Sequence, residues 1–227
     1  MEGTRIYIAE QRGETIIEGG WLNNTLNYGE YTSSHREPIG CLRHVNTWTG
    51  IPGQSFVLPL PEQSISVFIP LVSALVVYVK GREYTAPLGS LLALPAEKGT
   101  DVQIRQSGAG NDHFIFQQFV FSAVSVFKDI RIYALPIADP TNKNRMIPVL
   151  EDGCAPFQAY IGAFIGKTDY KLILDPEFNH AFALTLDGHF EVEKCLLFHG
   201  DALSLTGLKE LDTECLSDTG LLLAFQF

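Results

Sequence analysis

The residues of this chain that could bind a metal ion or act as nucleophiles are its six histidines and four cysteines. Two imidazoles on one strand can share a metal when they stand at alternating positions, because such residues point to the same face. No two histidines of this chain have that spacing, and those after residue 150 stand alone or beside glycines. We therefore expect the histidines after residue 150 to lie on the surface or in turns and to bind no metal. The six are His35, His44, His113, His180, His189 and His199.

The cysteines are also widely spaced, and none forms a Cys-x-x-Cys pair. Such spacing is typical of free thiols in a reducing compartment, where they pack as small apolar side chains. A nucleophilic cysteine needs an activating base, and the sequence offers none. The first residues also lack the apolar segment of a secretory signal, so we expect a cytoplasmic protein. The four are Cys41, Cys154, Cys195 and Cys215.

Composition argues against several classes of partner. The chain has 16 Lys and Arg against 26 Asp and Glu, which gives a formal net charge of −10. We therefore expect binding neither to nucleic acid nor to a membrane surface, because both need clustered basic residues. The longest apolar stretch, 67–79, contains Pro70 and is shorter than the about 20 residues of a membrane helix. Since 46% of the residues are hydrophobic, the chain can form a substantial core.

Short apolar runs separated by glycines and prolines predict an all-β fold. The runs are rich in Val, Ile, Phe and Tyr, which favour strands, and helical periodicity is scarce. One short helix is expected around 122–128. Turn-forming residues gather in 136–156, with a strand near 146–150, and this segment is interpreted as a connection between two halves. The other expected strands are 55–60, 65–69, 75–79, 91–94, 102–105, 114–121, 158–165, 170–174, 180–186, 190–192, 202–205 and 221–227.

An internal repeat supports the division into two halves. The segments 87–94 and 198–205 align without a gap, and each has a glycine followed by an alternating apolar strand. Both halves then end in a strand rich in aromatic residues. The order and even spacing of these matches indicate a duplication. The matched pairs are Gly89 with Gly200, Leu92 with Leu203 and Leu94 with Leu205.

Short motifs in a fixed order connect the chain to a known family. Those of the first half are Arg12-Gly13, Gly20-Trp21-Leu22, Asn27-Tyr28-Gly29-Glu30-Tyr31, Gly40-Cys41-Leu42-Arg43-His44-Val45-Asn46 and Pro52-Gly53-Gln54-Ser55-Phe56. In this order they resemble the opening of the pirin-like bicupins, which include pirin and quercetin dioxygenase-like proteins, and 186–203 is similar to the second cupin of that family. The resemblance implies two jelly-roll (cupin, RmlC-like) barrels, 1–120 and 150–227, joined by an irregular segment, 121–149.

The resemblance also implies where a metal would bind. Metal-dependent dioxygenases of the family carry His-Pro-His just after the Gly-Phe lead, and a His followed two residues later by Glu on a later strand. Three imidazoles and a carboxylate hold Fe(II) or a similar ion and leave positions open for substrate and oxygen. Here Leu58-Pro59-Leu60 stands in the first place, and 100–105, in the second, contains neither His nor Glu. We therefore expect no metal, no cofactor and no catalytic residue at this site.

Five residues are candidate contacts for a small ligand, which a barrel of this size can enclose. Arg43 and His44 are neighbours in a predicted strand, so one of them faces inward, although a surface or hydrogen-bonded role is the alternative. Leu58 and Leu60 stand in the places of the missing histidines, and Gln103 lies in the strand of the second missing pair.

Three functions are compatible with this sequence. The first is a pirin-related bicupin that has lost its metal site and binds a small molecule or a protein without catalysis. The second is an oxidoreductase similar to quercetin 2,3-dioxygenase, with an atypical site. The third is a structural or oligomeric partner that buries apolar strands against another chain, for which Leu71–Val77 is the candidate contact strand.

Overall fold

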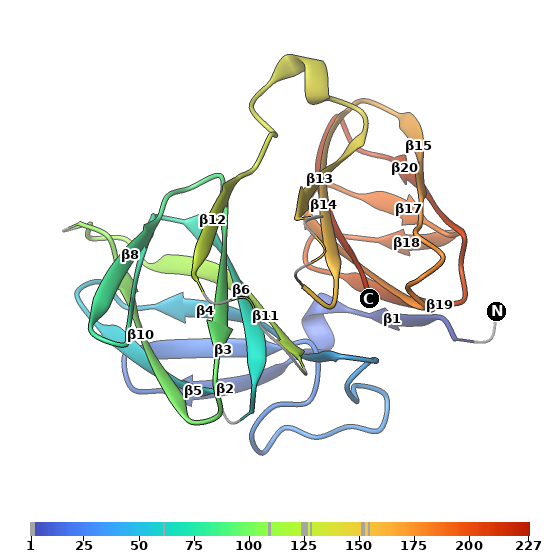
Figure 1. The fold of residues 1–227 in the computed structure, drawn as a ribbon. Helices are drawn as coiled ribbons and strands as arrows, with labels where there is room; N and C mark the ends of the chain where they lie inside the picture. Colours follow the sequence, from blue (N-terminus) through green and yellow to red (C-terminus); the bar gives the residue numbers. More distant parts are fainter. Residues whose placement is uncertain are drawn as a thin grey trace. The chain divides into compact units, whose positions relative to one another are not determined.

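The computed structural model describes residues 3–60, 62–108, 110–123, 127, 129–150, 153 and 155–227. Nearly all regular structure in these residues is antiparallel β-sheet, so the all-β prediction is confirmed (Figure 1). None of their helices is long and apolar enough to cross a membrane. The chain divides into a first unit, residues 13–134, and a second unit, residues 1–12 together with 135–227.

The first unit contains a seven-stranded and a four-stranded sheet. The larger has the order β12-β9-β6-β11-β4-β3-β2 and the smaller β5-β10-β7-β8. Non-consecutive neighbours in both sheets show that long connections cross between them, as in a jelly roll. The strands are β2 (Gly13–Ile17), β3 (Gly20–Asn24), β4 (Leu42–Gly50), β5 (Ser55–Leu60), β6 (Ser64–Val72), β7 (Leu75–Val79), β8 (Arg82–Ala86), β9 (Ser90–Ala96), β10 (Thr100–Gln106), β11 (Phe114–Ser122) and β12 (Arg131–Ala134).

The second unit repeats this plan with a six-stranded sheet, β1-β19-β16-β21-β14-β13, and a four-stranded sheet, β15-β20-β17-β18. Two short 3₁₀ helices, η1 (Ala9–Gln11) and η2 (Pro140–Asn142), accompany the strands. The strands are β1 (Arg5–Tyr7), β13 (Met146–Leu150), β14 (Gln158–Ile165), β15 (Thr168–Ile173), β16 (His180–Asp187), β17 (Phe190–Val192), β18 (Cys195–Leu197), β19 (Ala202–Thr206), β20 (Glu210–Cys215) and β21 (Thr219–Gln226).

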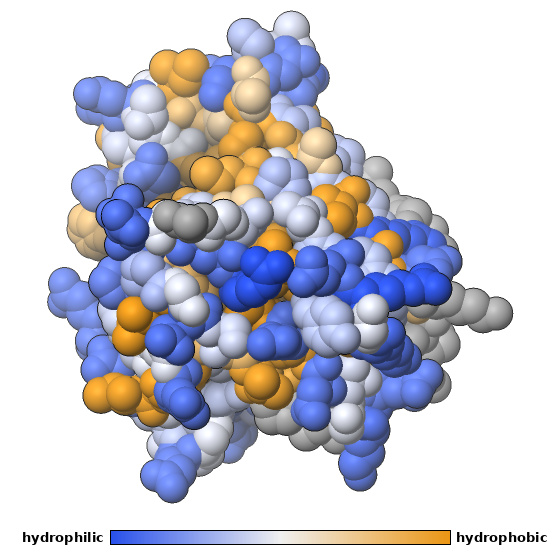
Figure 2. Space-filling model, turned by 90° about the vertical axis from the view of Figure 1, so that its left-hand side faces the viewer, coloured by the Kyte–Doolittle hydropathy of each residue, from blue (hydrophilic) through white to orange (hydrophobic). Residues whose placement is uncertain are grey.

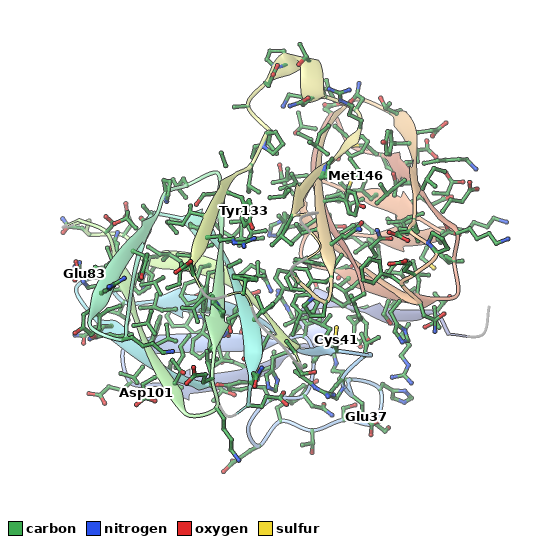
Figure 3. All side chains as sticks on the ribbon, in the orientation of Figure 1. Glu37, Cys41, Glu83, Asp101, Tyr133 and Met146 are labelled. Carbon is green, nitrogen blue, oxygen red and sulfur yellow. The ribbon has the colours of Figure 1, made fainter. Side chains whose placement is uncertain are left out.

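Alternation along the strands places apolar side chains between the two sheets of each unit. In β5, for example, Leu58 is 2% exposed whereas its neighbour Val57 is 61% exposed. Side chains fill the space between the sheets, and Glu83 and Asp101 lie on the outer side of the small sheet (Figure 3). Hydrophilic residues surround scattered apolar ones over the lower half of the face drawn in Figure 2. The two faces of the small sheets therefore differ as in an antiparallel sandwich, whereas the central strands of the large sheets, such as β6, β9 and β11, are buried on both faces.

The predicted duplication is visible in the strands β9 and β19. Gly89 and Gly200 precede these strands with φ of 73° and 83°, the left-handed region that favours glycine. The leucines at 92 and 94 belong to the apolar cluster of the first unit, and those at 203 and 205 to the cluster of the second. The repeated sequence pattern therefore codes for the same turn and the same inward-facing strand in both units.

A second repeated element was not noticed in the sequence. The tripeptide Arg-Ile-Tyr occurs as Arg5–Tyr7 in β1 and as Arg131–Tyr133 in β12. In β1 the tyrosine is paired with Ala202 of β19, and in β12 it is paired with Leu91 of β9. Ala202 lies two residues after Gly200, and Leu91 lies two residues after Gly89. The same tripeptide thus forms the same edge strand in each unit.

This edge strand explains why the structure divides the chain at other positions than the expected ones. The strand β1 precedes the first unit in sequence but pairs with β19 of the second. The expected connecting segment, 121–149, also contains regular structure, because β12 adds to β9 and most of β13 falls within it. The expected helix around 122–128 lies largely outside the described residues.

The expected strands are otherwise present, and seven that no run predicted accompany them. The additional strands are β1, β2, β3, β8, β12, β18 and β20, which are short or carry polar residues. The candidate contact strand Leu71–Val77 is instead the turn between β6 and β7 with its flanking residues. Leu75, Val76 and Val77 are buried, whereas Val72 is 40% exposed.

The turn between β17 and β18 stores backbone strain. Glu193 and Lys194 have φ of 49° and 64°, where side chains other than glycine are disfavoured. We predict that Lys194→Gly raises the free energy of unfolding by about 1 kcal/mol. Urea unfolding measures this, and Lys194→Ala is the control because alanine keeps the unfavourable φ. An equal gain from both variants would show that the side chain, and not the backbone, causes the strain.

Candidate functional site

The positions of the family's metal motif lie on β5 and β10 of the first unit. These strands are neighbours, and Leu58 is paired with Val102 and Phe56 with Ile104. The inward-facing residues of the stretch where the second ligand pair is expected are Val102 and Ile104. With Leu58 and Leu60 they form one apolar surface inside the unit. The structure therefore brings the four positions together, as the motif requires, but with aliphatic side chains.

These residues do not fit a metal ion. A leucine, valine or isoleucine side chain has no lone pair to donate, and its burial excludes the water that would complete a coordination shell. All four side chains are at most 2% exposed and belong to one apolar cluster with Phe56, Phe68 and Phe116. Across the part of the chain that the structure describes, no three His, Cys, Asp or Glu side chains are grouped so that they could hold a metal.

Polar side chains lie instead on the inner face of the seven-stranded sheet. Asn46 of β4 is paired with Gln118 of β11. Asn46 lies two residues before Trp48, which belongs to the apolar cluster. The Trp48 indole Nε1–H donates to Gln118 Oε1 over 2.7 Å, and Asn46 Nδ2 donates to the same oxygen over 3.4 Å. Both amide side chains are buried. Sequence reasoning missed this cluster, because its members are about 70 residues apart and only the strand register unites them.

His44 continues this inward face of β4, and Arg43 does not. His44 Nδ1–H donates to the Asn27 backbone oxygen over 3.2 Å, and its ring contacts the Tyr28 ring edge-on at a centroid distance of 5.1 Å. Arg43 Nε donates to Ser122 Oγ over 3.0 Å and lies 3.5 Å from Glu62 Oε1. The side chains of Arg43 and Glu62 are both partly exposed, so this ion pair contributes little to stability.

The five predicted contacts are therefore not brought together. Leu58 and Leu60 face the interior, whereas Gln103 is exposed on the outer face of β10 and donates to Ser55 Oγ over 3.0 Å. Gln103 is an outward residue because it alternates with Val102 and Ile104. The signal was present in the sequence, since the apolar residues of 100–105 occupy the even positions.

The histidines after residue 150 lie where they were expected. His189 and His199 are exposed, and His180, partly buried, lies 3.1 Å through Nδ1 from Thr206 Oγ1. The cysteine thiols at 41 and 195 are held in the protonated form, because burial raises the pKa of Cys41 to about 11 and also raises that of Cys195. Cys215 is buried, and Cys154 lies outside the described residues. Cys41 and Cys195 therefore provide no reactive thiolate.

Burial lowers the pKa of the His44 imidazole below its usual 6.5, although its hydrogen bond to Asn27 and the charge of Glu62 act in the opposite direction. The unfolded chain thus takes up this proton at a higher pH than the folded chain. The free energy of unfolding should therefore fall on acidification through the window below 6.5, until the folded form is also protonated.

We predict that His44→Gln removes this part of the acid sensitivity, since glutamine can still donate to Asn27 but does not titrate. Urea unfolding at about pH 7 and about pH 5 measures the effect for both proteins. The loss between the two pH values should be smaller in the variant. An unchanged loss would contradict the burial of His44 as its cause.

Comparisons with known proteins identify solved structures that share this fold. No family model matches the sequence, and no curated protein matches it. Pirin YhhW from Escherichia coli in complex with nickel(II) has a TM-score of 0.84 at 15% identity, over 99% of this chain and 98% of that one. The chain has the fold of the pirin-like bicupins. Quercetin 2,3-dioxygenase from Acinetobacter baumannii is also similar, with a TM-score of 0.66 at 16% identity over 99% and 79% of the two chains.

The bicupin fold predicted from the sequence is thus confirmed. At 15–16% identity the agreement is one of fold, and the four apolar positions on β5 and β10 are consistent with a chain that has diverged far from these neighbours. The nickel ion of pirin YhhW belongs to that protein. The aliphatic side chains at 58, 60, 102 and 104 of this chain have no atom that could bind a metal ion.

Proposed function

We propose that this bicupin is a pirin-related protein whose first unit has lost the metal site and acts as a non-catalytic binding module for a small molecule. The observation that carries the proposal is the apolar surface made by Leu58, Leu60, Val102 and Ile104. Metal-dependent dioxygenation needs an ion with open coordination positions, and four aliphatic side chains supply neither ligands nor room for them.

Loss of the ligands leaves the remainder of the fold intact. Replacing four polar groups by aliphatic ones adds apolar contact, so the interior can be more stable than a metal-free site with four unpaired ligands. The polar residues around Asn46 and Gln118, on the opposite inner face, offer hydrogen bonds without redox chemistry. Such a site binds by shape and hydrogen bonding alone, as many small-molecule pockets do.

An oxygen-uptake experiment tests the non-catalytic part of this proposal. The purified chain is mixed with quercetin and with nickel, iron(II), copper(II) or manganese(II) salts in turn. We expect uptake no faster than with the same salt and quercetin alone, because no side chain at the site holds the ion. Saturable, enzyme-dependent uptake with any of these ions would overturn the proposal and favour the dioxygenase alternative.

A further inference from the structure

A row of opposed residues crosses the small sheet of the first unit and ends in a charged side chain. Leu58 of β5 is paired with Val102 of β10. Continued by one residue, the register between β10 and β7 places Val102 opposite Val79. Val79 is paired in turn with Arg82 of β8, which is the edge strand of this sheet. The row that starts at a position of the family's metal motif therefore continues through two valines and ends at Arg82.

Arg82 lies on the inward-facing side of β8. Side chains two positions apart on a strand share a face. Tyr84 packs against the apolar cluster of the first unit and Ala86 belongs to it, so Arg82 shares their face. Glu83 lies instead on the outer side of the sheet, where its carboxylate is 3.1 Å from the Arg105 guanidinium (Figure 3). Arg82 is thus a cation at the end of a largely apolar inner face.

A cavity of about 540 Å³ opens at this end of the sheet. This volume is in the range of small-molecule sites, roughly 300–1,000 Å³. Its apolar lining is close to the core, because Val79 belongs to the apolar cluster and the side chains of Tyr84 and Ile130 pack against it. Its charged lining is exposed, so a ligand can enter from solvent. The charged lining residues are Lys80, Arg82 and Asp129.

The charges of the cavity favour an anion. The Arg82 guanidinium has no ion-pair partner among the residues that the structure describes. Lys80 Nζ lies 3.7 Å from Glu97 Oε1, but the two side chains are 62% and 78% exposed, so this ion pair is weak and Lys80 can turn toward a ligand. Asp129 is a carboxylate on the same lining, and the two cations outnumber it.

We infer that this cavity binds a small organic anion, in which a carboxylate or phosphate group is joined to an apolar body the size of one ring. The Arg82 guanidinium offers paired N–H donors that match two oxygens of such a group. Lys80 adds a second positive charge, and Val79, Tyr84 and Ile130 provide apolar contact. The inference rests on the proposed function, since it gives the place of binding and the ligand class of that non-catalytic module.

An inward charge on an edge strand also has a purely structural explanation. Because β8 is the edge of the small sheet, a charged side chain on it discourages pairing with a strand of another molecule. That role needs the charge of Arg82 but neither the cavity nor a ligand. The two explanations therefore differ in whether Arg82 retains an anion that enters the cavity.

Benzoate combines the two required features, and it is titrated into the full-length protein labelled with nitrogen-15. Benzamide has nearly the same shape without the charge, and acetate has the charge without the ring. The backbone amide signals of 79–84 and 129–130 report on the cavity in NMR spectra. We expect these signals to shift saturably with benzoate and the two controls to bind at least about tenfold more weakly. Phenyl phosphate, titrated in parallel, distinguishes a phosphate group from a carboxylate.

Two variants with opposite expected effects locate the anion. Arg82→Gln should weaken binding of the tighter anion at least about tenfold, whereas Asp129→Asn should strengthen it about two- to fivefold by removing a like charge. Both side chains are exposed, so neither variant should disturb folding. Arg5→Gln is the matched control, because it makes the same change of charge at an exposed residue of β1 in the second unit. It should leave the affinity unchanged.

Several results would overturn the inference. They are the absence of saturable binding by either anion, equal binding of benzamide, and affinity that survives Arg82→Gln or falls equally in Arg5→Gln. Each would leave Arg82 as a guard of the edge strand. The oxygen-uptake test of the proposed function depends on the metal positions around Leu58 and has a separate readout, so failure of either test can be recognised independently.

Discussion

Leu58→Asn is expected to lower the free energy of unfolding by about 3–5 kcal/mol, because it places an amide among aliphatic and aromatic side chains without a hydrogen-bond partner. Leu58 is buried in the apolar cluster of the first unit, opposite Val102. Asparagine has nearly the shape of leucine, so the loss comes from burying a polar group and not from a cavity. Urea unfolding of the purified variant measures it.

The adjacent residue provides the matched control. Val57 lies in the same strand, faces outward and is largely exposed, so Val57→Asn should cost no more than about 1 kcal/mol, the scale of strand preference. The difference between the two variants is the quantity of interest. Equal losses, or a larger loss at Val57, would mean that the strand presents its other face to the interior.

Gln226→Leu is expected to cost about 2–4 kcal/mol, because it removes a buried amide that hydrogen-bonds three groups of the second unit. Gln226 is 1% exposed. Its Oε1 accepts the backbone N–H of Asp175 over 2.9 Å, and its Nε2 contacts Gln158 Oε1 and, over 3.0 Å, the Tyr160 hydroxyl. Thermal unfolding should show a clear decrease in the midpoint temperature.

Gln103→Leu is the control for this second prediction. It replaces the same residue type on an outer strand face, where the side chain is exposed and makes a single hydrogen bond to Ser55. The expected change is within about 0.5 kcal/mol. A similar decrease in both variants would contradict the network around Gln226 as the source of the loss.

The fold could be predicted largely from local pattern. The alternation of β5 and the glycine-led repeat at 89 and 200 were visible in the sequence, because burial of one strand face enforces a period of two. The edge strands β1 and β12 were not predicted, since three or four residues carry too little periodicity. The repeated Arg-Ile-Tyr at 5–7 and 131–133 was the signal that could have revealed them.

The candidate site could be predicted only in part. The apolar substitutions at 58 and 60 were evident, because a motif of fixed residue types allows their replacement to be recognised. The polar cluster of Asn46, Trp48 and Gln118 could not be predicted in the same way. Asn46 and Gln118 meet through strand register across a long sequence separation, and no local pattern encodes that pairing. The sequence indicated only that one of Arg43 and His44 faces inward, and the partners of His44 depend on a loop that places Tyr28 beside it.

The measurement that tests the central claim most directly is the metal content of the chain, purified without chelator and analysed for nickel, iron, copper and manganese. With aliphatic side chains at 58, 60, 102 and 104, the expected content of each metal is far below one ion per chain, and dialysis against any of these salts should not raise it. One tightly held ion per chain, lost when residues of the first unit's interior are substituted, would contradict the account.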